Sequence, residues 1–249
     1  MDLQAYIDYL VTWLQETVAK TGTKGLIVGV SGGIDSALVA HLIKRACPQT
    51  SLGVILPCNS NPQDKADALA VIASAGIDFV EVDLSATRDA LIGEIREVTE
   101  TTTPQWQLVD GNLRARLRMT TLYALAQNHG YLVVGTDNAA EWHTGYFTKF
   151  GDGGVDLVPL VHLTKGQVRE AARLVGVPEQ VITKAPTAGL WEGQTDENEM
   201  GTTYDMIDAY LLGETIPDHD RQIIERLHTV SAHKRTTAAA PVSMHGETK

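Results

Sequence analysis

The sequence has few cysteines and few cations, and it lacks a long hydrophobic run. Its two cysteines, Cys47 and Cys58, have the spacing of neither a zinc site nor a CxxC redox pair, so we expect free, buried thiols. The 20 Lys and Arg residues face 31 Asp and Glu, and the net charge of −11 argues against nonspecific nucleic-acid binding. No apolar stretch reaches the about 18 residues of a membrane span. We therefore expect a cytoplasmic protein with neither a membrane nor a nucleic-acid partner.

The chain has 249 residues, of which 43% are hydrophobic, and we expect a single domain over residues 1–249 with a flexible tail at 237–249. Short runs rich in β-branched residues predict strands at Gly25–Val30, Leu52–Pro57, Asp78–Asp83 and Tyr131–Gly135. Helical periodicity lies before, between and after them, at Leu3–Val18, Ser36–Ala46, Asp64–Ala75, Gly111–Asn128, Thr164–Leu174 and Thr203–Leu211. This alternation predicts an α/β fold, a Rossmann-like doubly wound parallel sheet with helices on both faces.

Ligands of such sheets bind beyond the carboxyl ends of the strands, where the strand order reverses. The first of these strand ends reads Ser31-Gly32-Gly33-Ile34-Asp35-Ser36. Glycines allow close approach of the backbone to a ligand, and the following helix N-terminus favours an anion such as pyrophosphate. Because Asp35 would repel a phosphate directly, its presence indicates an intervening Mg²⁺. The pattern is neither a Walker A loop nor a dinucleotide fingerprint.

The motif resembles the SGGxDS signature of the ATP pyrophosphatases, which split ATP between its α- and β-phosphates. Further motifs are similar, in order and spacing, to the synthetase domain of the NAD synthetase family. They are Asn112–Met119, Val134–Glu141, Thr144–Asp152, Lys184–Ala188, Asp196-Glu197 and His233–Arg235. The resemblance runs from about Gly25 to Arg235, nearly the whole chain. It implies the adenine nucleotide alpha-hydrolase-like fold, with ATP as co-substrate and Mg²⁺ as cofactor.

The resemblance also assigns roles to single residues. The expected ATP-binding residues are Gly29, Val30, Ser31, Gly32, Gly33, Ile34, Asp35, Ser36, Thr136, Lys165 and Thr187. The expected deamido-NAD-binding residues are Arg116, Lys149, Asp156, His233 and Lys234. Asp35 and Glu141 are the expected Mg²⁺ ligands, and together with Lys165 they are the expected catalytic residues. Read without the family, Glu141 is an ordinary surface position and each of these lysines is a solvated head on an apolar stem.

The reaction that the resemblance implies joins ammonia to deamido-NAD. The nicotinate carboxylate attacks the α-phosphorus of ATP, pyrophosphate leaves, and ammonia displaces AMP from the mixed anhydride to give NAD. Asp152 is a candidate for accepting the ammonium proton. The polar segment Ala185–Met200 is expected to close over the site, because water would hydrolyse the anhydride.

Ammonia, rather than glutamine, is the expected nitrogen donor, because the chain has no room for the amidase domain of glutamine-dependent members. A homodimer is implied by the family. The apolar residues of Gly111–Asn128, namely Leu113, Leu117, Leu122, Tyr123 and Leu125, either form its contact surface or belong to the core. Two other functions remain open: another amidating or thiolating ATP pyrophosphatase, and a nucleotide-binding regulator that never turns ATP over.

Overall fold

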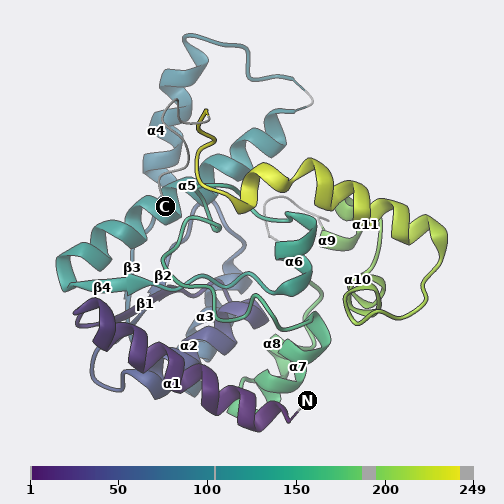
Figure 1. The fold of residues 1–249 in the computed structure, drawn as a ribbon. Helices are drawn as coiled ribbons and strands as arrows, with labels where there is room; N and C mark the ends of the chain where they lie inside the picture. Colours follow the sequence, from purple (N-terminus) through teal and green to yellow (C-terminus); the bar gives the residue numbers. More distant parts are fainter. Residues whose placement is uncertain (1, 104, 187–194, 242–249) are drawn as a thin grey trace.

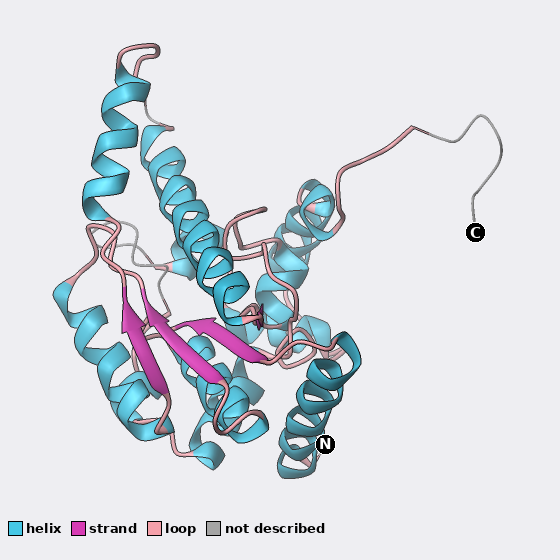
Figure 2. Ribbon diagram, turned by 90° about the vertical axis from the view of Figure 1, so that its left-hand side faces the viewer, coloured by secondary structure: helices cyan, strands magenta, loops and turns pink. Residues whose placement is uncertain are grey.

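The computed structural model describes residues 2–103, 105–186 and 195–241. A parallel sheet has the strand order β3-β2-β1-β4, with β1 at Gly25–Gly29, β2 at Ser51–Ile55, β3 at Asp78–Glu81 and β4 at Tyr131–Val133. Helices lie on both faces of these strands (Figure 2). The doubly wound α/β fold predicted from the alternation of strands and helices is therefore confirmed, and β1 and β4 flank the point where the strand order reverses.

Alternate side chains of each strand pack on opposite faces of the sheet. Leu26 and Val28 of β1 join a cluster with α1 (Leu3–Thr21), α2 (Ile34–Ala46), α3 (Pro62–Ala75), α7 (Lys165–Val175) and α8 (Glu179–Ile182). Ile27 faces the other way, against α5 (Trp106–His129). The two cysteines belong to these two clusters, one in each, and both are free and buried as predicted.

The α5 helix begins earlier than the sequence pattern indicated, and its apolar stripe is largely core. Leu117, Leu122, Tyr123 and Leu125 pack against the second cluster, so the interpretation of these four residues as core is the one the structure favours. Figure 1 shows α5 and α4 (Ser85–Arg96) projecting together beyond the sheet. Apolar residues near the end of this projection, Leu108 and Val109, are about half exposed.

A third cluster lies beside the sheet and is built from short helices. It contains Ala140 of α6 (Ala139–Thr144), Met200 of α9 (Asp196–Met200), Tyr204 and Ile207 of α10 (Tyr204–Leu211) and Ile224 of α11 (Asp218–Val230). The helix α10 matches the predicted Thr203–Leu211, whereas α4, α6, α8, α9, α11 and the 3₁₀ turn Ala232–Arg235 were not predicted. No helix among the described residues is sufficiently long and apolar to cross a bilayer.

Candidate active site

The glycine-rich turn lies between β1 and α2, where the sequence placed it. Gly32 has a φ of 83°, a conformation that side chains disfavour. A Cβ there would approach the carbonyl oxygen of Asp64 to 2.6 Å and the Cβ of Asp67 to 2.9 Å. The turn is closed by Ser31 and Ser36, whose hydroxyl oxygens are 3.1 Å apart. Both its conformation and its packing against α3 therefore require glycine at position 32.

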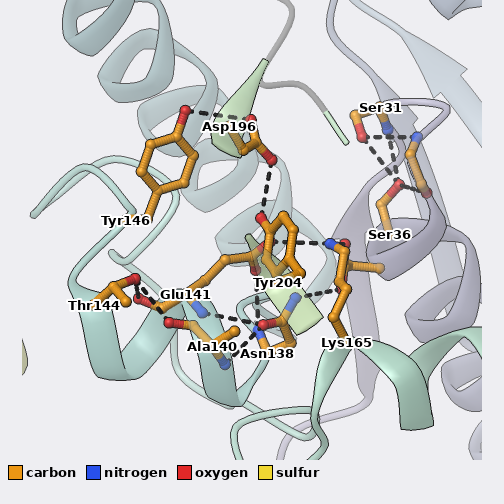
Figure 3. Close-up of polar contacts among 12 residues, drawn as sticks. Ser31, Ser36, Asn138, Ala140, Glu141, Thr144, Tyr146, Lys165, Asp196 and Tyr204 are labelled. Carbon is orange, nitrogen blue, oxygen red and sulfur yellow. Dashed lines mark hydrogen bonds and ion pairs between the residues drawn. The ribbon is translucent and has the colours of Figure 1, made fainter. Parts of the chain in front are cut away.

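Asp35, Glu141 and Lys165, which are far apart in the sequence, meet beside this turn, and Figure 3 shows Glu141 and Lys165 side by side. The Lys165 ammonium nitrogen lies 2.6 Å from Asp35 Oδ2 and 3.2 Å from Glu141 Oε1. Only 3% of the Lys165 side chain is exposed, against 16% for Asp35 and 14% for Glu141. Since each residue begins or lies in a different helix, α2, α6 or α7, the tertiary fold alone brings these three charges together.

Asn138 orients both carboxylates from the start of α6. Its side-chain amide donates to Asp35 Oδ1 at 2.9 Å, and its backbone N–H donates to Glu141 Oε2 at 3.1 Å. The Asn138 side-chain oxygen in turn accepts from the backbone of Ala140 and Glu141, so the pair forms a capping box. The sequence interpretation gave Asn138 no role, although Asn followed three residues later by Glu is a recognisable capping signal.

Tyr204 is a second residue of the site that the sequence interpretation missed. Its side chain is fully buried, and its hydroxyl lies 3.1 Å from Glu141 Oε1 and 2.9 Å from Asp196 Oδ2. The Lys165 ammonium sits 4.6 Å from the centre of the Tyr204 ring, a cation–π contact. Beyond Asp196, the Tyr146 hydroxyl donates to Asp196 Oδ1 at 3.2 Å and also to Glu199. Figure 3 shows this chain of contacts leading from Glu141 to α9.

The electrostatics of the cluster reflect its burial. Burial alone lowers the pKa of Lys165, but the adjacent charges of Asp35 and Glu141 outweigh it, so the net pKa is raised and the ammonium stays charged. Burial and the neighbouring Asp35 charge raise the pKa of Glu141 despite its contact with Lys165. Asp137 is 4% exposed, its Oδ2 has no hydrogen-bond partner in the described structure, and burial raises its pKa well above the ordinary value. The site therefore concentrates negative charge around one lysine.

The donor set at this cluster suits a hard divalent cation. Among the described residues, no group of three or more His, Cys, Asp or Glu side chains has the arrangement of a complete metal cage. Mg²⁺ does not need one, because it is commonly held by one or two carboxylates together with substrate phosphates and water. Asp35 and Glu141 already converge on a single cation, the Lys165 ammonium, and lie beside the glycine-rich turn. The two carboxylates predicted as metal ligands therefore fit Mg²⁺ bound with a nucleotide.

Four of the five residues predicted to bind deamido-NAD form one group. The Arg116 guanidinium donates to the Lys149 carbonyl at 3.3 Å, and the Lys149 ammonium donates to the His233 carbonyl at 2.5 Å. Lys234 donates to the carbonyls of Gly145 and Phe147, at 2.8 and 2.7 Å. Arg116 and Lys234 thus hold backbone carbonyls of the loop at residues 145–150, and Lys149 connects that loop to His233.

The remaining predicted residues have other surroundings. Asp156 accepts from the Tyr123 hydroxyl at 3.0 Å and from the Val133 N–H at 2.8 Å, so its carboxylate fastens the following loop to β4 and α5. Thr136 lies partly buried just beyond β4. Thr187 and half of the predicted closing segment, residues 187–194, lie outside the described residues, and the end of that segment forms α9.

Comparison with known proteins shows what the chain resembles as a whole. The NAD synthase family matches residues 6–239. An NH(3)-dependent NAD(+) synthetase of Mesoplasma florum is 52% identical over 97% of this chain and 98% of its own length. The solved NMN synthetase from Francisella tularensis is 40% identical with a TM-score of 0.91, covering 97% of this chain and 99% of that one. The NH3-dependent NAD synthetase from Campylobacter jejuni is 28% identical with a TM-score of 0.79, covering 97% and 99%.

Proposed function

This chain belongs to the NAD synthase family, and on that premise we propose that it is an ammonia-dependent NAD synthetase. Such an enzyme is a ligase that forms a carbon–nitrogen bond and uses ATP as co-substrate. The observation that carries the proposal within the structure is the buried cluster of Asp35, Glu141 and Lys165 beside a glycine turn at the switch point of a parallel sheet. A nucleotide-binding regulator would have little need for two metal-binding carboxylates there.

The first step is adenylation of the nicotinate carboxylate of deamido-NAD. A carboxylate oxygen forms a bond to the α-phosphorus of ATP, and the bond to the bridging oxygen of the β-phosphate breaks. The backbone N–H groups of the Gly32-Gly33 turn and the N-terminus of α2 receive the pyrophosphate. Asp35 and Glu141 would hold Mg²⁺, which would supply a Lewis acid for the phosphate oxygens. Lys165 neutralises charge that develops on the leaving group, and Thr136 and Thr187 contact the nucleotide.

The second step transfers nitrogen. Ammonia forms a bond to the activated carbonyl carbon, AMP leaves with the electron pair of the carbon–oxygen bond, and one proton is lost from nitrogen. We propose Asp152 as the acceptor of an ammonium proton, since its Oδ1 is oriented by the Thr148 N–H at 3.1 Å. We assign Arg116, Lys149, His233 and Lys234 to the dinucleotide, because the fold assembles these residues, three of them cations, next to the loop at residues 145–150. We propose that Asp156, which follows this loop in the chain, also contacts the dinucleotide.

A second candidate is an NMN synthetase, in which the acceptor is the nicotinate mononucleotide. The similarity to the Francisella tularensis protein favours it specifically, because that structure has the TM-score of 0.91 over nearly the full length of both chains. The chemistry at the carboxylate is the same in both candidates. They differ only in whether the site also binds the adenylate half of the acceptor. The relatives that are about half identical in sequence carry the dinucleotide-forming name, which is why NAD synthesis is the first proposal.

The test is an amidation assay with ATP and Mg²⁺ that compares two acceptors and two nitrogen donors. Deamido-NAD and nicotinate mononucleotide are each supplied with ammonium chloride or with glutamine. We expect NAD and AMP from deamido-NAD and ammonium, with kcat/KM at least about tenfold above that for the mononucleotide, equivalent to ~1.4 kcal/mol. The reverse ratio would replace NAD synthesis with NMN synthesis. Amidation of neither acceptor, in a protein that binds ATP, would reject both candidates.

We also propose that the active protein is a cytoplasmic homodimer. The support for the dimer is the projecting α4–α5 pair, where Leu91 of α4, Val98 of the connection between the helices, and Leu108 and Val109 of α5 are exposed large apolar side chains. Light scattering after size-exclusion chromatography would measure the mass directly. A monomer at assay concentrations would contradict the dimer while leaving the proposed reaction untouched.

A further inference from the structure

Lys165 and the proposed metal ion are assigned to the same two carboxylates. Asn138 donates to one oxygen of each carboxylate, Asp35 Oδ1 and Glu141 Oε2. The Lys165 ammonium contacts the other oxygen of each, Asp35 Oδ2 at 2.6 Å and Glu141 Oε1 at 3.2 Å, and Figure 3 shows it against Glu141. A divalent ion that bridges the two carboxylates through these oxygens would take the position that the ammonium occupies.

The two cations cannot share these oxygens at low energy. Mg²⁺ binds oxygen at about 2.0–2.1 Å, so a metal on Asp35 Oδ2 would stand within a few ångströms of the ammonium nitrogen. Both charges would be buried, where their mutual repulsion is weakly screened. We infer that Lys165 and Mg²⁺ compete for Asp35 and Glu141, and that metal binding displaces the Lys165 ammonium toward the phosphates of the nucleotide. This inference rests on the proposed function, which assigns the metal to these carboxylates.

Backbone hydrogen bonds fix the position of Lys165 at the start of α7. Its backbone N–H donates to Asp208 Oδ1 at 3.0 Å, and the N–H of Gly166 donates to Asp208 Oδ2 at 2.7 Å, so the start of α7 is anchored. The four-carbon side chain beyond that anchor is an unbranched stem with rotatable bonds. A swing of the ammonium therefore needs no movement of the helix.

Tyr204 contacts both Glu141 and the Lys165 ammonium. Its hydroxyl contact with Glu141 Oε1 does not involve the lysine, so the carboxylate keeps an orienting partner when the ammonium leaves. Its ring face lies 4.6 Å from the ammonium, a cation–π contact that helps to hold the positive charge beside the carboxylates. Tyr204 is thus a positioning residue for Glu141, and its own place is fixed by Asp196.

The decisive measurement is the affinity for Mn²⁺ alone, without nucleotide, from the spin-resonance signal of the free ion. In Lys165→Met the carboxylates lose their internal counterion but keep Asn138 and Tyr204. We expect Mn²⁺ to bind the variant at least about tenfold more tightly than the unsubstituted protein, because a neighbouring positive charge has been removed. NAD formation by the same variant is expected to fall. If Lys165 served only to build the site, its substitution would lower both the Mn²⁺ affinity and NAD formation. Unchanged or weaker Mn²⁺ binding by the folded variant would overturn the inference.

Two further variants show whether any tighter binding belongs to this pair of carboxylates. Lys184 also bridges two carboxylates, Asp64 Oδ1 at 2.9 Å and Asp67 Oδ2 at 2.7 Å, so Lys184→Met removes an equivalent cation elsewhere. Any Mn²⁺ that Lys184→Met binds more tightly should lie between Asp64 and Asp67 and remain when Glu141→Gln is added, and a gain that Glu141→Gln abolishes would overturn the inference. In the double variant Lys165→Met/Glu141→Gln the gain is expected to vanish, whereas its persistence would place the bound ion outside the proposed site.

A measurement on the unsubstituted protein covers the case in which Lys165→Met does not fold. With ¹⁵N-labelled lysine, the Lys165 side-chain signal can be assigned as the one missing from Lys165→Arg, which keeps the charge. Saturating Mg²⁺ is expected to shift this signal and leave that of Lys184 in place, and an unmoved Lys165 signal would overturn the exchange. Both readouts are independent of turnover. If the protein makes NAD but Lys165 and the metal ion do not compete for the two carboxylates, the exchange is rejected and the proposed function stands. If they compete but the protein amidates no acceptor, the proposed function alone is rejected.

Discussion

The hydroxyl group of Tyr204 lies between the carboxylates of Glu141 and Asp196, at 3.1 and 2.9 Å from their oxygens. One O–H group thus touches two acidic side chains in a place that solvent does not reach. Since Asp196 begins α9 and Glu141 lies in α6, the tyrosine connects the helix that follows residues 187–194 to the proposed metal ligands. The contact explains why a residue of α10 is needed for the geometry of a site formed mainly at the sheet.

Substitution of Tyr204 by Phe should therefore affect turnover more than nucleotide binding. Without the hydroxyl, Glu141 loses a hydrogen bond that orients its carboxylate. A displacement of reacting groups by about 1 Å can reduce kcat by roughly 100-fold. We expect kcat to fall by about 10- to 100-fold with little change in the KM for ATP, and the free energy of unfolding to fall by about 1–3 kcal/mol. Steady-state kinetics and urea unfolding measure both effects.

Tyr210 provides the matched control for that variant. It lies in the same helix, and its ring packs against His143 with centroids 5.6 Å apart, away from the cluster. Tyr210→Phe should leave kcat unchanged. Equal losses in the two variants would show that α10 acts only through its general stability.

Gly32→Ala should disrupt the nucleotide site. The residue would have to adopt a φ of 83° and place its Cβ 2.6 Å from the Asp64 carbonyl oxygen. Strain of this kind costs about 1–3 kcal/mol, and relief of it by movement of the turn should raise the KM for ATP. Titration with ATP and thermal unfolding are the measurements.

Gly93→Ala is the corresponding control in α4, where an added Cβ has no atom within 4 Å. Alanine is the better helix former, so this variant should be stabilised by about 0.5–1 kcal/mol with normal activity. If Gly32→Ala bound ATP as the unsubstituted protein does, the requirement for glycine in the turn would be disproved.

His143 should make stability depend on pH. Burial, followed by the charges of His228 and Arg235, lowers the pKa of His143 to about 4. The unfolded chain has a pKa of about 6.5 at this residue, so between these values it binds a proton that the folded protein does not. Stability is therefore complete above about pH 6.5 and declines as the pH falls toward 4.

Because the imidazole is only partly buried, we expect the free energy of unfolding to fall by about 1 kcal/mol more between pH 7 and pH 5 in the unsubstituted protein than in His143→Gln. Denaturant unfolding at the two pH values gives this difference. Parallel pH profiles for the two proteins would contradict the pKa assignment.

Lys234→Met should weaken binding of the acceptor selectively. The ammonium holds the carbonyls of Gly145 and Phe147, and its removal frees the loop that carries Lys149. We expect the KM for deamido-NAD to rise by about tenfold, ~1.4 kcal/mol, with the KM for ATP little changed. Varying each substrate in turn separates the two. An equal rise in both KM values would indicate that the loop supports the whole site rather than the acceptor alone.

The sequence determined the strands, six of the helices and the chemistry of the first turn. Alternating β-branched runs and helical periodicity predicted the parallel sheet, because both are local consequences of which face each residue buries. The motif Ser31–Ser36 likewise indicated a phosphate-binding turn, since glycine φ freedom and a helix N-terminus are local properties. Helices α6, α8 and α9 were missed because they carry too few residues to show a period, and α6 is defined by its capping box instead. The helices α4 and α11, with 12 and 13 residues, are long enough to show a period and were also missed.

The tertiary structure decided which side chains meet. Asp35 and Lys165 are 130 positions apart, and no local pattern gives the 2.6 Å between their charged atoms. Asn138 and Tyr204 acquire roles only because α10 packs against α6 and α7, which turns an ordinary cap and an ordinary core tyrosine into the partners of two carboxylates. The sequence alone therefore indicates a nucleotide site, whereas the competition of two cations for one pair of oxygens follows from the packing of distant helices.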